Sequence, residues 1–179
     1  MSIRFAVPAD APAVADIYAH YVQETAITFA TETPAPGDYA ARMADERYPF
    51  LVAEEDGRVQ GFIYAGAFRT KEAYRWDVEL TLYLAPGSTG RGLGRLLMDA
   101  CLRLLQAQGY LNAYSCITLP NERSIGLHRR FGFTELGVFP HTGYKLGKWH
   151  DVIWLGKELG DFSQPPKEPL PVAAIQNRL

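Results

Sequence analysis

Residues 77 to 109, DVELTLYLAPGSTGRGLGRLLMDACLRLLQAQG, join an alternating segment, a glycine cluster and a helical pattern in direct succession. Apolar and other side chains alternate over 78–84, which predicts a half-buried strand that Pro86 ends. Four glycines follow in the eight residues 87–94, and the apolar spacing of 93–105 predicts a helix that Gly109 ends. Glycine loses more backbone entropy on ordering than any other residue. The cluster therefore indicates a chain that turns tightly or lies against something bulky.

The rest of the chain predicts short helices and strands around this unit. Asp56-Gly57 separates two β-rich runs and suits the positive φ angles of a tight hairpin. Asp10 is expected to cap one helix and Asn121 another. The other expected elements are strands at 3–7, 112–119, 133–138 and 150–156 and a helix at 38–47. Together they predict an α+β domain with a mixed, mostly antiparallel central sheet and helices on both faces.

The length of 179 residues suits a single globular domain, which we place at residues 1–160. The remaining tail, 161–179, carries four prolines that exclude regular helix and central strand. We expect this tail to be extended and either docked or partly disordered.

The composition argues against several partners. A formal net charge of -2 gives no overall field that attracts nucleic acid or an anionic membrane. The N-terminus lacks a signal-peptide core and no apolar run approaches membrane-spanning length, so we expect a cytoplasmic protein. Cys101 and Cys116 lie in apolar patterns and are expected to be buried, free thiols. The four histidines are scattered, and we predict no metal site.

Glycines before a helix N-terminus can accommodate a phosphate, because the free N–H groups point at it and the backbone is bare. Arg91 and Arg95 add positive charge. The loop is no P-loop, since no Lys-Ser or Lys-Thr follows Gly94, and the spacing of Gly90, Gly92 and Gly94 does not match a dinucleotide fingerprint. A flexible turn that merely starts the helix is the alternative.

The order of alternating strand, x-x-Gly92-x-Gly94, helix, strand and LPNERSIGLHRRFGF resembles the GNAT superfamily of acyl-CoA N-acyltransferases. In that family the loop amides bind the coenzyme A pyrophosphate, the preceding strand contacts the pantetheine through its backbone, and the asparagine before the next helix touches the cofactor. The resemblance implies acetyl-CoA as co-substrate. It assigns the binding of acetyl-CoA to Leu82, Tyr83, Leu84, Gly90, Arg91, Gly92, Leu93, Gly94, Arg95 and Asn121.

Further stretches, among them ITFATETP, AYRWDVELTLYL and GYKLGKWHDVIW, look like the phosphinothricin and methionine sulfoximine N-acetyltransferases. This likeness covers roughly residues 2–160. The chain departs from it at Thr89, where the family usually has Gln or Arg, which affects one polar phosphate contact but not backbone binding. The resemblance implies acetyl transfer to a small amino-acid-like amine, by direct attack in a ternary complex, in a homodimer.

Acyl transfer to an amine needs a base, because an ammonium group has no lone pair and an α-amino group with a pKa of about 8 is mostly protonated at neutral pH. Glu79, opposite the apolar side of the alternating strand, is the candidate base and resembles the family's proposed one. The alternative is a solvated carboxylate. The departing thiolate needs stabilising or protonating. His128 stands where many members have tyrosine and is the candidate acid, the alternative being a surface histidine.

Four residues are expected to bind the acceptor: Phe29, Tyr74, Arg75 and Lys145. An arginine such as Arg75 can hold a carboxylate in bidentate fashion, and its alternative role is a surface charge. Two rival functions stay open at this point. One is N-acetylation of another amine or of a protein N-terminus, and the other is a non-catalytic coenzyme A binding module.

Overall fold

One seven-stranded sheet runs through the molecule, and the computed structural model describes all 179 residues. The strands follow the order β1-β2-β3-β4-β5-β7-β6, and only β4 and β5 run parallel to each other. Their bounds are Ser2–Phe5 for β1, Phe50–Glu55 for β2, Arg58–Ala67 for β3, Asp77–Leu84 for β4, Asn112–Thr118 for β5, Thr134–Lys145 for β6 and Lys148–Glu158 for β7.

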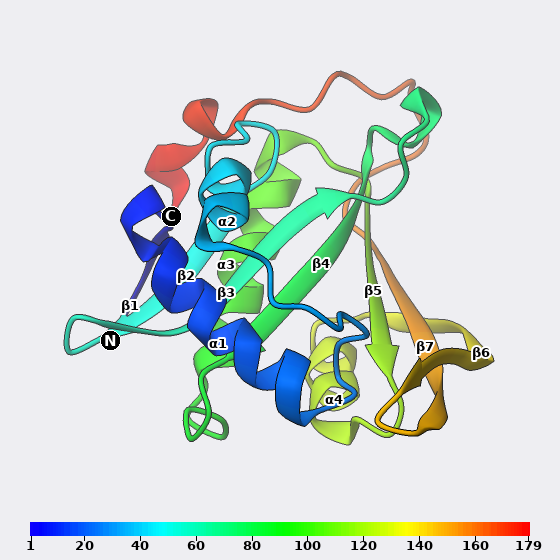
Figure 1. The fold of residues 1–179 in the computed structure, drawn as a ribbon. Coiled ribbons are helices and arrows are strands. Elements are labelled where there is room, and N and C mark those ends of the chain that lie inside the picture. Colours follow the sequence, from blue (N-terminus) through cyan, green and yellow to red (C-terminus); the bar gives the residue numbers. More distant parts are fainter.

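Helices cover both faces of this sheet (Figure 1). The helices α1 (Ala11–Glu24) and α2 (Pro36–Met43) lie on one face, and α3 (Leu93–Gln108) and α4 (Glu122–Arg130) lie on the other. The predicted fold class is confirmed. Four short 3-10 helices complete the chain: η1 (Pro8–Asp10), η2 (Glu72–Tyr74), η3 (Val172–Ala174) and η4 (Gln176–Arg178).

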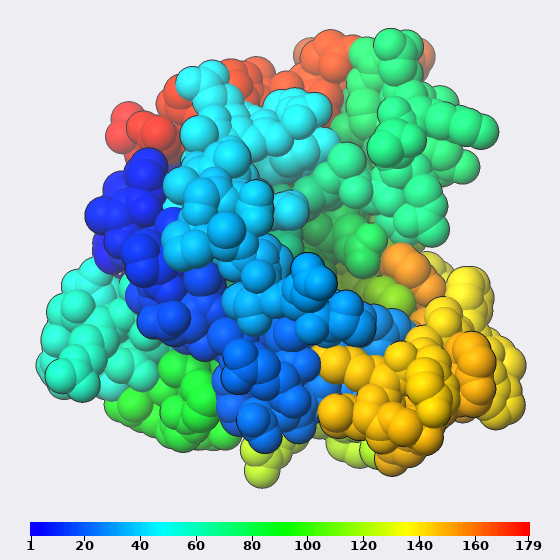
Figure 2. All heavy atoms as spheres, in the orientation of Figure 1, coloured from blue at the N-terminus to red at the C-terminus, as the bar shows by residue number.

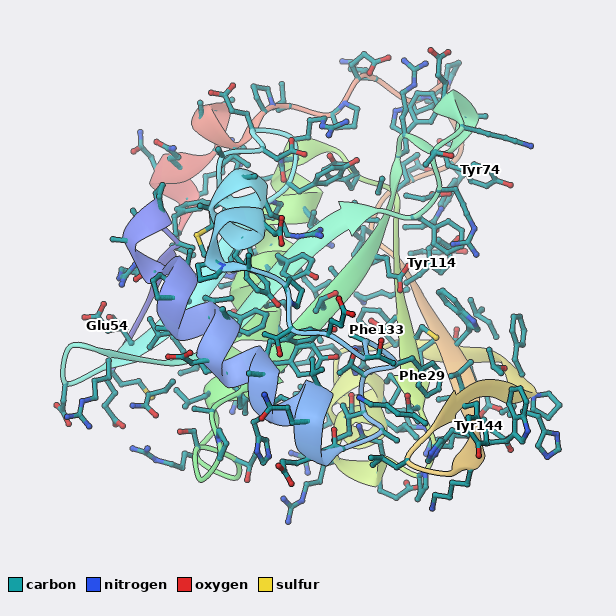
Figure 3. All side chains as sticks on the ribbon, viewed as in Figure 1. Phe29, Glu54, Tyr74, Tyr114, Phe133 and Tyr144 are labelled. Atoms are coloured by element: carbon teal, nitrogen blue, oxygen red, sulfur yellow. The ribbon has the colours of Figure 1, made fainter.

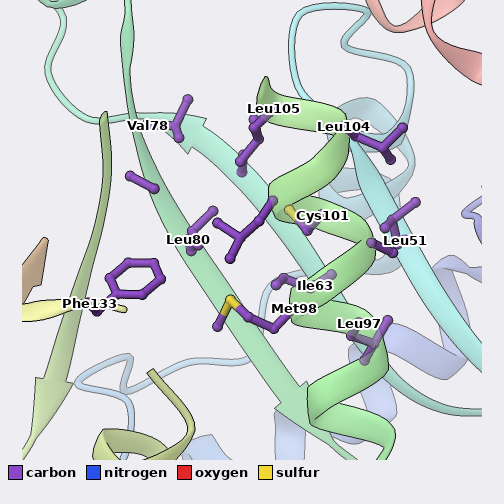
Figure 4. Close-up of a cluster of buried hydrophobic side chains, with 14 of the residues drawn as sticks. Leu51, Ile63, Val78, Leu80, Leu97, Met98, Cys101, Leu104, Leu105 and Phe133 are labelled. Carbon is purple, nitrogen blue, oxygen red and sulfur yellow. The ribbon is translucent and has the colours of Figure 1, made fainter. Parts of the chain in front are cut away.

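The main core lies between α3 and the sheet (Figure 4). The apolar stripe of α3 that the spacing predicts is almost fully buried, and burial of each such side chain contributes about 1.5–3 kcal/mol. Because this stripe is fixed against β2, β3 and β4, the N-terminus of α3 is fixed as well. Figure 4 labels Leu97, Cys101, Leu104 and Leu105 of this stripe, together with Met98, which is buried beside them.

Several local predictions are confirmed. Asp56 and Gly57 form the hairpin turn between β2 and β3 with φ angles of 50° and 72°. Gly109 ends α3 in the left-handed conformation, and Asn121 caps α4 by accepting the N–H of Ser124 at 3.2 Å. These features depend on contacts within a few residues, which is why the sequence predicts them.

Other predictions are wrong in detail. The carboxylate of Asp10 does not cap α1 but accepts the N–H of Val7 and pairs with Arg4 at 2.7 Å. The helix expected at 38–47 lies at 36–43, because Pro36 suits a first helical position and the chain turns after Met43. The two last strands are longer than expected. They form one hairpin, and most side chains of β6 are exposed on both faces, so no alternation marks its length.

The tail is docked, in agreement with one of the two alternatives left by the sequence. Ile175 is 1% exposed and belongs to the main core. The N–H of Leu170 donates to the carbonyl of Gln108 at 2.7 Å, and the N–H of Val172 donates to that of Glu46 at 2.7 Å. In Figure 1 the tail crosses one end of the sheet on its way to the C-terminus.

Candidate active site

The sheet splits between β4 and β5. The two strands pair only over Asp77–Glu79 and Asn112–Tyr114, and they then diverge (Figure 1). Beyond Glu79, β4 keeps β3 as a partner on one side, while its other edge has no strand partner. One carbonyl there, that of Leu84, accepts the hydroxyl of Tyr21 at 2.6 Å. The backbone of Leu82, Tyr83 and Leu84 is therefore next to an opening in which an extended ligand can be bound.

The glycine loop lies where this opening meets α3. Gly87, Gly90 and Gly92 have φ angles of 81°, 79° and 83°, and Gly92 is the N-cap of α3. A Cβ atom at Gly90 or Gly92 would meet nothing within 4 Å, so close packing within the chain does not explain these glycines. Their backbone conformation explains them, because residues with a side chain rarely adopt positive φ angles. The loop exposes bare backbone at a helix N-terminus, which fits the phosphates of coenzyme A.

The charge around the loop is smaller than the sequence implies. The guanidinium of Arg91 is paired with the carboxylate of Glu55, whereas Arg95 makes no ion pair. Asn121 uses its side-chain oxygen to cap α4. Binding of a diphosphate would therefore depend mainly on backbone N–H groups, the dipole of α3 and Arg95.

Glu79 lies at the point where the sheet splits, in register with Gly66 of β3 and Tyr114 of β5. It is half-buried, and burial raises the pKa of its carboxyl, while the charge of Arg69 acts in the opposite direction. Cys116 lies two residues beyond Tyr114 and faces the same side. The prediction that Cys116 is buried is wrong, since this residue is exposed. Its thiol is nevertheless partly shielded from water, and this desolvation together with the charge of Glu79 raises the pKa of the thiol to about 11.

His128 is buried against the other face of the sheet. Its Nδ1 atom is 2.8 Å from the carbonyl oxygen of Ser124, and its Nε2 atom is 2.9 Å from the hydroxyl of Ser115. A carbonyl can only accept, so Nδ1 carries a proton and donates it. Burial lowers the pKa of the imidazole and favours its neutral form, in which Nε2 accepts the proton of Ser115.

Arg75 and Tyr74 lie in the segment between β3 and β4. The guanidinium of Arg75 is paired with the carboxylate of Glu168 in the tail and approaches that of Glu72 at 3.6 Å. Tyr74 is 40% exposed and packs against Phe68 with 6.1 Å between ring centroids. The ion pairs do not favour the predicted contact between Arg75 and an acceptor carboxylate.

Lys145 and Phe29 connect the segment after α1 to the β6–β7 hairpin. The ammonium group of Lys145 is buried and donates to the carbonyl of Thr28 at 2.8 Å, and burial lowers its pKa. The ring of Phe29 occupies the space that a Cβ atom at Gly143 would need. Both residues therefore lie where segment 28–29 packs against the β6–β7 hairpin. The ammonium group of Lys145 already has a hydrogen-bond partner within the protein, the carbonyl of Thr28.

Sequence reasoning missed Arg69, which follows β3. Its guanidinium makes no ion pair and lies over the ring of Phe68 at 4.1 Å and that of Trp154 at 5.7 Å. Phe68 in turn contacts Tyr114, with 4.4 Å between centroids. These side chains are on the same side of the sheet as Glu79. The only sequence signal for Arg69 is a cation ten residues before the candidate base.

Figure 2 shows a hollow on this face between segment 68–76 (green) and the β6–β7 hairpin (yellow). Figure 3 shows Tyr74 and Tyr114 on one side of it and Phe29 and Tyr144 toward the hairpin. A separate cavity of about 460 Å³ lies between Ile27, the end of β5 and Trp149, and Glu79 does not line it. No three His, Cys, Asp or Glu side chains come together in a way that could hold a metal ion.

Comparison with known proteins agrees with this geometry. Residues 3–154 match the family model of the acetyltransferase (GNAT) domain. Phosphinothricin N-acetyltransferase of Streptomyces viridochromogenes is 37% identical over 98% of this chain and 96% of its own length. The L-methionine sulfoximine/L-methionine sulfone acetyltransferase of Salmonella typhimurium is 34% identical, over 92% and 98%. A solved phosphinothricin acetyltransferase of Sinorhizobium meliloti, in complex with AcCoA, superposes with a TM-score of 0.89 at 33% identity, with 94% of each chain covered.

The chain belongs to the GNAT acetyltransferase family, and the resemblance stated from its motifs is confirmed. It is an enzyme of the acetyl-CoA-dependent N-acyltransferase class. No helix in the structure combines the length and the apolar character that crossing a membrane requires.

The conformation of Gly92 leads to a first prediction. Gly92→Val should abolish the rise in melting temperature that acetyl-CoA causes, since a β-branched residue disfavours the positive φ angle on which the loop depends. Gly109→Val is the matched control, because it introduces a similar strain at a φ of 92° at the other end of α3, where a Cβ atom also meets nothing within 4 Å. Both variants should lose about 1–3 kcal/mol of stability without ligand. A Gly92 variant that keeps the full shift would remove the loop from the binding site.

Proposed function

We propose that this enzyme transfers the acetyl group of acetyl-CoA to the α-amino group of a small amino acid of the phosphinothricin, methionine sulfoximine or methionine sulfone type. The observation that carries the proposal is the half-buried carboxyl of Glu79 at the split between β4 and β5, with the unpaired guanidinium of Arg69 acting on it. A base and a carboxylate ligand on one side of the sheet suit an acceptor that bears both an amine and a carboxylate.

Acetyl-CoA supplies the acetyl group as an activated thioester. The backbone edge of Leu82–Leu84, the loop Gly90–Arg95 and Asn121 would hold it, as the resemblance to the GNAT family implies. Support comes from the unpaired edge of β4 and from the bare glycines at the N-terminus of α3.

Glu79 is proposed as the general base. Its carboxylate makes no hydrogen bond within the protein, so it is free to accept a proton from the ammonium form of the acceptor. A carboxyl with a raised pKa is a stronger base, and burial in this position raises it. The acceptor amine, once neutral, has the lone pair that attack on the thioester requires.

Direct transfer in a ternary complex is the proposed route. A covalent acyl carrier would need a thiolate, and the two thiols are poor sources of one. Burial raises the pKa of Cys101 to about 12, and that of Cys116 is about 11. Both are protonated at neutral pH, which supports attack of the amine on the thioester itself.

His128 keeps its proposed role as the acid for the departing thiolate, with less support than Glu79 has. Only the imidazolium form carries a proton on Nε2 while Nδ1 donates to Ser124, and burial disfavours that form. The hydroxyl of Ser115, 2.9 Å from Nε2, is a second group beside His128 that carries a proton.

Glu79→Gln is expected to lower kcat by about 10²-fold or more at neutral pH, because the amide cannot take the proton from the acceptor. Binding of acetyl-CoA should stay near that of the wild type. In a pH profile the wild-type activity should fall on the acid side, because the Glu79 carboxyl becomes protonated. Since burial raises the pKa of this carboxyl, the fall should occur at a higher pH than for an ordinary glutamate. The variant should lack this limb and gain activity at high pH, where the amine deprotonates unaided. Glu24→Gln at the exposed end of α1 is the control, and full activity of the Glu79 variant would assign the base elsewhere.

Arg69→Ala should lower kcat/KM for methionine sulfone by about 10- to 100-fold, mainly through KM, because a hydrogen bond to a charged group contributes about 1.5–3 kcal/mol. The same change should reduce the preference for the free amino acid over its carboxamide. Arg58→Ala, on the exposed start of β3, should leave both quantities unchanged. If the wild type acetylates the carboxamide as well as the free acid, or prefers peptides, the amino-acid assignment is wrong while the acetyltransferase class stands.

We also propose that the β6–β7 hairpin is the contact between two copies in a homodimer. Large apolar side chains are exposed along it, and β6 is an edge strand with a free side. Exposed apolar side chains on a hairpin with an unpaired edge are typical of an interface. The residues concerned are Leu136, Val138, Phe139, Tyr144, Leu146 and Trp149, which are 43–61% exposed.

Sedimentation velocity should therefore give about twice the chain mass of 20.0 kDa. Phe139→Asp should shift the protein to monomer, because a charge in an apolar interface must be desolvated without a partner. Leu96→Asp is the control, since Leu96 is also exposed but lies on α3. A monomeric wild type, or a dimer that Phe139→Asp leaves intact, would rule out this interface.

A further inference from the structure

We propose that the tail segment 167–172, here called the strap, positions the start of β4 and with it Glu79. In this arrangement Arg75 is a positioning residue held by the strap and not a ligand of the acceptor. The inference builds on the proposed function and adds a segment beyond residues 3–154, the part that matches the family domain.

The strap is fixed at its C-terminal end. The side chain of Gln108, at the end of α3, is 1% exposed and donates to the carbonyl of Leu170 at 2.7 Å, while the N–H of Leu170 donates to the backbone carbonyl of Gln108. Gln108 also donates to the carbonyl of Arg47 at 2.9 Å. Ile175 then inserts into the main core. This end of the strap is thus tied to α3, whose apolar stripe is buried in the main core.

The other end of the strap holds the segment before β4. The carboxylate of Glu168 is paired with Arg75, and the carbonyl of Lys167 accepts the indole N–H of Trp76 at 2.7 Å. Figure 1 shows this part of the tail beside the connection between β3 and β4. Two consecutive strap residues therefore hold two consecutive residues that precede β4.

Trp76 is also the first residue of the junction between β4 and β5. Its carbonyl accepts the N–H of Leu111 at 2.9 Å and that of Asn112 at 3.4 Å, and the side chain of Asn112 donates to the carboxylate of Asp77 at 2.8 Å. Only three residue pairs follow before the sheet splits, and Glu79 belongs to the last of them. A shift of Trp76 is transmitted to Glu79 because the two residues lie three positions apart in the same short junction of paired backbone.

The Arg75–Glu168 pair is a suitable probe of this arrangement. Its side chains are 40% and 69% exposed, so its loss should leave the global stability nearly unchanged. An effect on catalysis without an effect on folding separates positioning from simple stabilisation. Asp99–Arg103, an exposed pair on α3 with no link to β4, is the matched control.

Steady-state kinetics with acetyl-CoA and methionine sulfone test the assignment of Arg75. Arg75→Gln and Glu168→Gln should each lower kcat by up to about fivefold, the change that loss of one exposed ion pair allows, with KM for the acceptor unchanged. The double variant should be no worse than either single one, and the swap Arg75→Glu with Glu168→Arg should restore kcat. Arg103→Gln should have no effect. A higher acceptor KM in Arg75→Gln alone, with the swap worse still, would make Arg75 a substrate ligand and overturn the proposal.

Hydrogen exchange of the full chain without substrate gives a readout that does not depend on the acceptor. Trp76→Phe, which removes the indole donor, and Glu168→Gln should speed exchange at residues 76–80 and 111–114 and leave α1 unchanged. Unchanged exchange at these strands would refute the strap even if turnover is normal. Faster exchange in a protein that acetylates no amino acid would keep the strap and refute the proposed acceptor.

Discussion

The short pairing between β4 and β5 is the constraint on which the rest of the site depends. Three residue pairs join the strands, and the sheet then opens. Antiparallel neighbours on both outer sides keep the opening in place, since β3 pairs with β4 over seven residues and β5 pairs with β7 over seven. The backbone groups that a continuous sheet would pair internally are thereby left for a ligand, and Glu79 lies at the vertex of the split.

The opening is useful only because a rigid helix begins beside it. The buried stripe of α3 fixes that helix on β2, β3 and β4, so its N-terminus and the glycines before it have one position relative to the free edge of β4. The site thus combines two sets of backbone donors, one from a strand and one from a helix end. Side-chain charge contributes less than the backbone to this site, because the guanidinium of Arg91 is already paired with the carboxylate of Glu55.

Charge is concentrated instead at the vertex of the split, around Glu79. Partial burial makes its carboxyl a stronger base, and the guanidinium of Arg69 limits that effect. Arg69 makes no ion pair, whereas Arg75, the arginine nearer in sequence to β4, is paired with Glu168 in the tail. The docked tail therefore engages Arg75 and leaves Arg69 as the arginine near Glu79 that has no carboxylate partner.

The sequence determined the features that depend on neighbours along the chain. Alternation over 78–84, the positive φ angles of Gly57 and Gly109 and the cap at Asn121 were predicted because each is fixed by local backbone geometry. The motifs also sufficed for the family, since its cofactor loop is contiguous. The tertiary structure alone decided which charged groups are free. Arg75 meets a carboxylate 93 positions away, and Lys145 meets a carbonyl 117 positions away. Exposure and pairing are set by packing between distant segments, and no local pattern records them.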